Sequence, residues 1–203
     1  RERGRTYRGA NPSSNGGLYS ILYKLTAITG DSIYGREADK DIKWFFNHCQ
    51  SPNTGLMAWG EHIGWDFFKE APIKWNSQAW LHEYKGFGQW DRAWELTPEA
   101  AEKFALGLWD HQIYAKTGEY AGEFSRHANY YWHGPSKGRG FPGHGGNYMK
   151  IWARAYLETG NEEFLTAIRT LLNYYEKNTS PESGAINYAT GFPEQYSLGQ
   201  SMG

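Results

Sequence analysis

Apolar residues recur with a helical period in three separate stretches of the chain. In residues 36–49 they form one stripe, made of Ala38, Ile42, Phe45, Phe46 and Cys49. The same spacing returns 63 residues later as Ala101, Ala105, Leu108 and Trp109, with Gln112 as a weaker fifth member. It returns again as Phe164, Ile168, Leu171, Leu172 and Tyr175. Apolar positions at this spacing share one face of a helix, so we expect amphipathic helices near 36–49, 98–113 and 162–177.

Partner helices precede two of these stretches. Apolar residues at helical spacing over residues 16–29 and 146–158 predict the first helix of a hairpin in each case. "TGD" at 29–31 and "TGN" at 159–161 each end one helix with glycine and open the next with a capping residue. Thr97-Pro98-Glu99 reads as an N-cap followed by proline at the first helical position. The stretch 76–96, interrupted by Gly86 and Gly88, is interpreted as a broken helix.

A Thr/Ser-Gly turn follows each of the three amphipathic stretches. The turns end at Gly55, Gly118 and Gly184, at intervals of 63 and 66 residues, which is the length of two helices plus loops. The sequence therefore predicts an all-α chain, 1–203 as a single domain or a fragment of one, with hairpin units of about 15–55, 56–118 and 119–184. Tandem antiparallel hairpins build either an α-solenoid or part of an α/α toroid. The long loops after the turns favour part of a six-hairpin-like toroid, with aromatic loops crowded on one rim.

Composition narrows the classes of function. The net charge of −1 gives no overall field for gathering nucleic acid, and we expect no nucleic-acid partner. No apolar run approaches the 18 or so residues that a membrane span needs, and the one cysteine, Cys49, lies on an apolar stripe, where burial is expected. Aromatic residues make up 17% of the chain, more than a core of this size needs.

Many of these aromatic residues lie in the loops. "GLMAWGEHIGWDFF" at 55–68 has the period of neither a helix nor a half-buried strand. Exposed Trp and Tyr rings stack on the faces of sugar rings, while acids, amides and histidines bond the hydroxyls. The alternative is that Trp59, Trp65, Phe67 and Phe68 close the end of the helical layer as core.

The order of short motifs resembles a known group of proteins. "MAWGEHIGWD", "WLHEYKG", "WELTPEAAEKF", "LWDHQIY" and "SRHANYYWHG" follow one another over residues 55–160. This order is similar to that of bacterial α/α-toroid polysaccharide-degrading proteins of the pectate-lyase-like group. The resemblance implies an extracytoplasmic enzyme, secreted or periplasmic, acting on plant or algal polysaccharide. Such chains are usually longer and have more than three hairpins, so further chain segments or self-association would complete the toroid.

The loops hold the groups that a polysaccharide lyase needs. The reaction requires a group that neutralises the uronate carboxylate, a base for the C5 proton and an acid for the leaving oxygen. The candidate catalytic residues are Arg126, His127, Tyr130, His62, His82 and Glu61. The candidate substrate-binding residues are Trp59, Trp65, Glu83, Tyr131, Trp132, His133, Lys137 and Arg139.

Two other functions stay open. A glycoside hydrolase uses a pair of carboxylates, and the same loops offer Glu61, Asp66, Glu83, Asp91, Glu123 and Glu194. A carbohydrate-binding helical repeat protein without catalysis would show aromatic loops and no convergent acid and base. No cofactor is expected, although "EH" at 61–62 and "HE" at 82–83 raise a divalent metal as an alternative.

Overall fold

The computed structural model describes residues 9–10, 15–58, 63–74, 81–83, 87–124, 127–129, 142–187 and 196–197. Six helices lie in these ranges: α1 (Gly16–Thr29), α2 (Ile33–His48), α3 (Trp90–Leu96), α4 (Pro98–Gln112), α5 (Pro142–Thr159) and α6 (Glu162–Lys177). The five helices predicted from periodicity are thus confirmed, and α5 begins four residues before its expected start. The described part of the chain is mostly helical, and none of its helices is long and apolar enough to cross a membrane.

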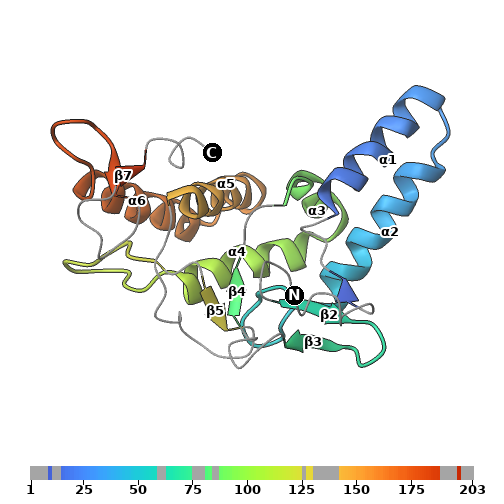
Figure 1. The fold of residues 1–203 in the computed structure, drawn as a ribbon, viewed down its shortest axis with the longest axis horizontal. Helices are drawn as coiled ribbons and strands as arrows, with labels where there is room; N and C mark the ends of the chain where they lie inside the picture. Colours follow the sequence, from blue (N-terminus) through green and yellow to red (C-terminus); the bar gives the residue numbers. More distant parts are fainter. Residues whose placement is uncertain are drawn as a thin grey trace.

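The helices pack in sequence order as consecutive pairs. α1 packs on α2, α3 on α4 and α5 on α6, and α4 contacts α2, α5 and α6. Figure 1 shows the order in space: the blue α1 and α2 lie at one side, the green α3 and α4 in the middle, and α5 and α6 at the other side. α4 is therefore the central helix of the described structure.

Strands are short and occur in three small sheets. β1 (Gly9–Ala10), β2 (Ile63–Asp66) and β3 (Ala71–Lys74) form one antiparallel sheet. β4 (Leu81–Glu83) pairs with β5 (His127–Asn129), and β6 (Ile186–Asn187) pairs with β7 (Tyr196–Ser197). The interpretation of 76–96 as a broken helix is wrong at Leu81–Glu83, which is a strand, whereas Trp90–Leu96 is helical; residues 76–80 and 84–86 lie outside the described part of the chain.

The predicted glycine turns have one backbone conformation in common. Gly55, Gly118 and Gly184 have φ of 72°, 83° and 69°, in the left-handed region that glycine adopts without a steric cost. Antiparallel bridges close the chain around them, Gln50 to Met57, Ile113 to Phe124 and Thr179 to Ile186. The second helix of each pair, α2, α4 or α6, is therefore followed by a loop that a β-bridge closes and that contains a glycine with a left-handed φ.

The first two closed loops pack directly on the second helix of the next pair, which is α4 for the first loop and α6 for the second. A Cβ on Gly55 would lie 2.3 Å from the carbonyl oxygen of Lys103, and a Cβ on Gly107 would lie 2.4 Å from that of Thr54. Gln50 Nε2 donates to the carbonyl of Ala100 on α4 at 2.8 Å. Backbone meets backbone here with no room for a side chain, which fixes the first loop on α4.

The second loop repeats this contact with a different glycine. A Cβ on Gly122 would lie 2.5 Å from the carbonyl oxygen of Thr170 on α6, whereas nothing lies within 4 Å of the Cβ position of Gly118. Gly184, in the third loop, also has nothing within 4 Å. Among the described residues, the third loop therefore has no following helix beneath its glycine.

Aromatic residues fill the interior between the pairs. Phe46 contacts Phe87 and Trp90, and Trp90 contacts Phe104, with ring centroids 5.6–6.1 Å apart. Cys49 is buried as predicted, and burial raises the pKa of its thiol well above the usual range. The apolar stripes of α2, α4 and α6 thus face one continuous core, except that Leu172 of the predicted α6 stripe is 45% exposed and Ala167 is buried there instead.

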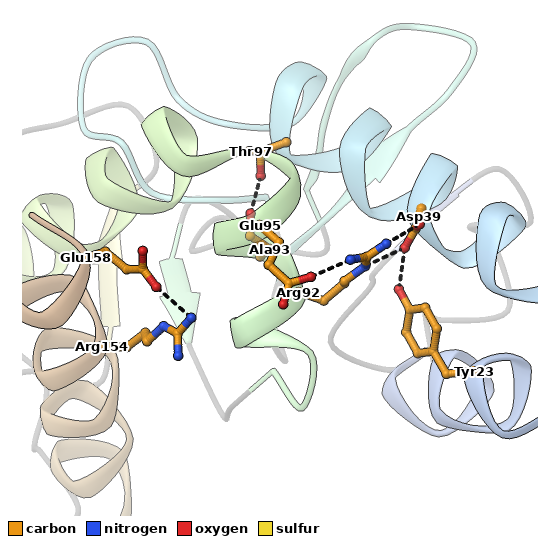
Figure 2. A network of polar contacts seen from close by, with 8 residues as sticks. All are labelled: Tyr23, Asp39, Arg92, Ala93, Glu95, Thr97, Arg154 and Glu158. Carbon is orange, nitrogen blue, oxygen red and sulfur yellow. Dashed lines mark hydrogen bonds and ion pairs between the residues drawn. The ribbon is translucent and has the colours of Figure 1, made fainter. Parts of the chain in front are cut away.

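A polar network joins the first pair of helices to α3 (Figure 2). Arg92 donates two hydrogen bonds to the Asp39 carboxylate, at 2.8 and 2.5 Å, and a third to Glu95. The Tyr23 hydroxyl donates to the same Asp39 at 2.9 Å. The hydrogen bond from Arg92 lowers the pKa of Asp39, and burial, followed by the bond to Asp39, raises the pKa of Tyr23 to about 12.

The helix starts differ from the prediction in one detail. Asn161 caps α6 by accepting from the amide of Glu163 at 3.0 Å, as expected. Thr97 precedes Pro98 at the start of α4, but its hydroxyl donates back to the carbonyl of Ala93 at 2.9 Å and does not cap α4 (Figure 2). Because α3 ends at Leu96, one residue before Thr97, the Thr97 hydroxyl bonds a carbonyl of the last turn of α3 instead of an amide of α4.

Two glycine substitutions separate the packing of the loops from their backbone conformation. Gly55→Ala is expected to lower the free energy of unfolding by at least about 3 kcal/mol, since the methyl group would overlap the Lys103 carbonyl at a left-handed φ. Gly184→Ala is expected to cost only about 1–2 kcal/mol, because it has the same φ and open space. Urea unfolding of the two variants checks this, and equal losses would contradict it.

Candidate active site

The structure brings two of the candidate segments together as adjacent strands. β4 and β5 are antiparallel, with Leu81 opposite Asn129, His82 opposite Ala128 and Glu83 opposite His127. Glu83 and His127 lie 44 positions apart in the chain and become ladder partners. The backbone of a predicted catalytic histidine is thus fixed beside two predicted site residues, His82 and Glu83.

Two further elements lie against this strand pair. β2, which follows His62 directly in the chain, contacts β4, and the central helix α4 contacts β5. β5 begins three residues after Phe124, whose bridge to Ile113 ties the chain to the end of α4. The strands β2, β4 and β5 therefore lie next to one another beside α4 (Figure 1).

Most of the other predicted site residues lie outside the described residues. These are Trp59, Glu61, His62, Arg126, Tyr130, Tyr131, Trp132, His133, Lys137 and Arg139. Arg126 immediately precedes β5 and His62 immediately precedes β2 in the sequence. The roles suggested for these side chains stay predictions.

Trp65 is not the exposed stacking residue that the sequence suggested. Its side chain is only 7% exposed and belongs to the core cluster. Phe67 and Phe68, at the turn between β2 and β3, are 46% and 75% exposed. The alternating faces of β2 explain the correction, because a strand against the helices must bury one face. The aromatic run at 55–68 therefore divides into core and surface.

Two candidate carboxylates serve other contacts. Asp66 Oδ1 accepts from the amides of Phe68 and Lys69, at 2.9 and 3.2 Å, and so holds the turn between β2 and β3. Asp91, on α3, is exposed and forms an ion pair with Arg154 at 3.4 Å. Both therefore have structural partners. Glu83 lies on β4, and Glu123, which is half-buried, precedes Phe124 in the closed loop after α4. Glu194 lies outside the described residues.

Histidines outside the strand pair differ in their surroundings. His48 is exposed, stacks on Trp44 and bonds the Trp44 carbonyl through Nδ1 at 2.7 Å. His111, at the end of α4, is buried, as is Gln112 beside it. Sequence reasoning missed these two, although Gln112 as the weakest member of an apolar stripe was the available signal.

A helical-hairpin chain with a small strand pair over its central helix is the class of structure that these observations define. The sequence profile of the family described as periplasmic pectate lyase matches residues 1–173. This match covers most of the chain, so the protein belongs to that family.

A solved structure supports the fold independently. The chain is similar to a sugar epimerase from a ruminal bacterium, with a TM-score of 0.59 at 11% sequence identity. The alignment covers 93% of this chain and 47% of the epimerase chain. The chain therefore spans about half the length of that structure, and the similarity concerns the fold alone.

The buried position of Trp65 has a direct consequence. Trp65→Ala is expected to lower the free energy of unfolding by about 3–5 kcal/mol through loss of core packing. Phe68→Ala, on the same hairpin, should change it by about 0.5 kcal/mol or less because Phe68 is exposed. Denaturant unfolding of both variants measures this. A Trp65→Ala variant with normal stability and weakened carbohydrate binding would contradict the core position.

Proposed function

We propose that the protein is a polysaccharide lyase that cleaves a uronate-containing polymer by β-elimination. The observation that carries the proposal is the β4–β5 register, which sets Glu83 opposite His127 in a member of the periplasmic pectate lyase family. Directly opposite positions in an antiparallel pair have Cβ atoms about 4.5–5.5 Å apart, close enough for two side chains to act on one sugar. The family description also supports an extracytoplasmic location.

Each residue has a proposed role in the reaction. Arg126 clamps the uronate carboxylate, since its planar guanidinium matches two carboxylate oxygens and is always charged. His127 or Tyr130 takes the C5 proton, and the electron pair of that C–H bond becomes the C4–C5 double bond. The C4–O bond breaks as this double bond forms, its electron pair leaves with the oxygen, and a protonated group, His62 or His82, gives its proton to that leaving oxygen. Glu61 and Glu83 orient these groups or bond substrate hydroxyls.

The remaining candidate residues would bind the polymer. Trp59, Tyr131 and Trp132 would stack on sugar rings, and His133, Lys137 and Arg139 would bond hydroxyls or carboxylates of an acidic chain. A histidine and a carboxylate at facing ladder positions also suit a divalent cation, so a metal-assisted variant of the same reaction is tested alongside. A glycoside hydrolase built on Glu83 and a second carboxylate, and a binder without catalysis, are the other outcomes.

Product analysis tests the reaction class. The protein is incubated with polygalacturonate, other polyuronates and neutral glycans, with and without EDTA, and both ultraviolet absorbance of unsaturated ends and reducing ends are followed. We expect unsaturated ends from a polyuronate. Reducing ends alone would mean a hydrolase, and neither would mean a binder. Loss of activity in EDTA that Mn²⁺ restores would mean that the site acts through a metal.

Arg126 and Trp59 should fail in different ways. Arg126→Ala is expected to lower turnover by roughly 10²–10³-fold, equivalent to about 2–4 kcal/mol of transition-state stabilisation. Trp59→Ala should weaken binding by about 1–2 kcal/mol with little change in turnover, because stacking serves ground state and transition state alike. Arg36→Ala, at an exposed arginine of α2 that bonds Ser32, is the matched control. Full activity in Arg126→Ala would contradict its role.

We also propose that the hairpins form part of an α/α toroid that further hairpins of the same polypeptide complete. Leu18, Ile21 and Ile28 on α1 are 53%, 55% and 81% exposed, and Gly184 has open space where Gly55 meets the next pair. Both ends of the row of helix pairs thus present surfaces that the middle pair buries.

We expect these 203 residues alone to self-associate in sedimentation measurements, with Ile21→Glu reducing the association. A stable monomer with α1 protected from hydrogen exchange would contradict this.

A further inference from the structure

Buried polar side chains gather where the end of α4 meets α5 and α6. Gln112 lies on the core stripe of α4 at the position that Cys49 holds on α2 and Tyr175 holds on α6. Its side chain is fully buried, and the neighbouring His111 is also buried. An amide and an imidazole thus lie at the end of the helix that contacts β5.

Two contacts determine which part of α5 lies beside them. Trp152 Nε1 donates to the carbonyl of Ala105 at 2.9 Å, in the middle of α4. Tyr148, one turn earlier on α5, contacts Phe124 with ring centroids 5.8 Å apart, and Phe124 is bridged to Ile113 just after α4. α5 therefore runs antiparallel to α4, and its first turns lie beside the last turn of α4.

These first turns of α5 and the end of α6 bring further polar groups. His144 Nε2, the Tyr148 hydroxyl and Gln112 Oε1 each expose less than 1 Å². A Cβ on Gly145 would lie 1.8 Å from the Tyr175 hydroxyl, so that hydroxyl meets the α5 backbone directly. Burial raises the pKa of Tyr175, which keeps its phenol neutral and able to donate. We call His111, Gln112, His144, Tyr148 and Tyr175 the junction cluster.

The junction cluster lies next to Phe124, which leads into β5, the strand that carries His127. Phe124, three residues before His127, packs its ring on both Tyr148 and Tyr175. Buried polar groups in folded proteins are hydrogen-bonded, and such networks hold their surroundings in one arrangement. A purely apolar junction would have filled the space without this directional control.

We propose that the junction cluster positions β5, and through it Arg126 and His127, for the reaction. The inference rests on the proposed function, and its residues are positioning residues because none of them is assigned a contact with substrate. Second-layer residues of this kind typically change activity by about 10–100-fold when removed.

Tyr148→Phe and Gln112→Met test the proposal in the complete protein. Each removes a polar group while nearly conserving volume. We expect turnover to fall at least tenfold with KM changed less than about twofold, because substrate contacts remain while the geometry of β5 loosens. Tyr19→Phe is the matched control: it removes another buried hydroxyl, one that donates to Asp41 on α2, far from β5 in the fold. Its turnover should equal that of the wild type.

Hydrogen exchange at β5 gives a readout that does not depend on activity. Amides of residues 127–129 should exchange at least tenfold faster in Tyr148→Phe and Gln112→Met than in the wild type, and at the wild-type rate in Tyr19→Phe. Unchanged exchange at β5, or the same modest loss of stability in all three variants with normal turnover, would overturn the positioning role. Faster exchange in a protein that yields no unsaturated product would instead support the positioning role and reject the lyase.

Discussion

One constraint determines the rest of the structure. The backbone of each of the first two closed loops lies directly against the second helix of the next pair. At Gly55 the carbonyl of Lys103 occupies the space where any side chain would begin, and Gly122 meets Thr170 in the same way. These contacts set how closely consecutive pairs approach. They therefore also determine where the segments leaving each loop emerge, including those that lead into β2 and β5.

Helix periodicity predicted the helices that bury an apolar stripe, because burial of one helix face requires an apolar residue at every third or fourth position. It failed at β4, because a strand of three residues is too short to show a period. The sequence left two readings of Trp65 open, a stacking residue or a core residue, because an irregular run has no period that separates packed rings from exposed ones. Gly118 ends the predicted turn, but Gly122 is the glycine that meets α6, and sequence spacing cannot show which of two nearby glycines lies against the next helix.

The candidate site could be predicted only as a set of residue types. The loops supplied Arg, His, Tyr and Glu, but their pairing depends on contacts between segments far apart in the chain. The ladder that sets Glu83 against His127 has no local signal. The junction cluster had a weak one, the amide of Gln112 among apolar positions. The family match supplies the chemical context from which the lyase reaction is proposed.

A double-mutant cycle between Glu83 and His127 tests most directly whether the β4–β5 pair forms one active site. Turnover on the active polyuronate is measured for Glu83→Gln, His127→Asn and the double variant. If the two side chains act on the same sugar, the losses should be strongly non-additive, with a coupling energy of about 1.5–3 kcal/mol and a double variant little worse than the worse single one. Losses that simply add, or no loss in either single variant, would contradict the account.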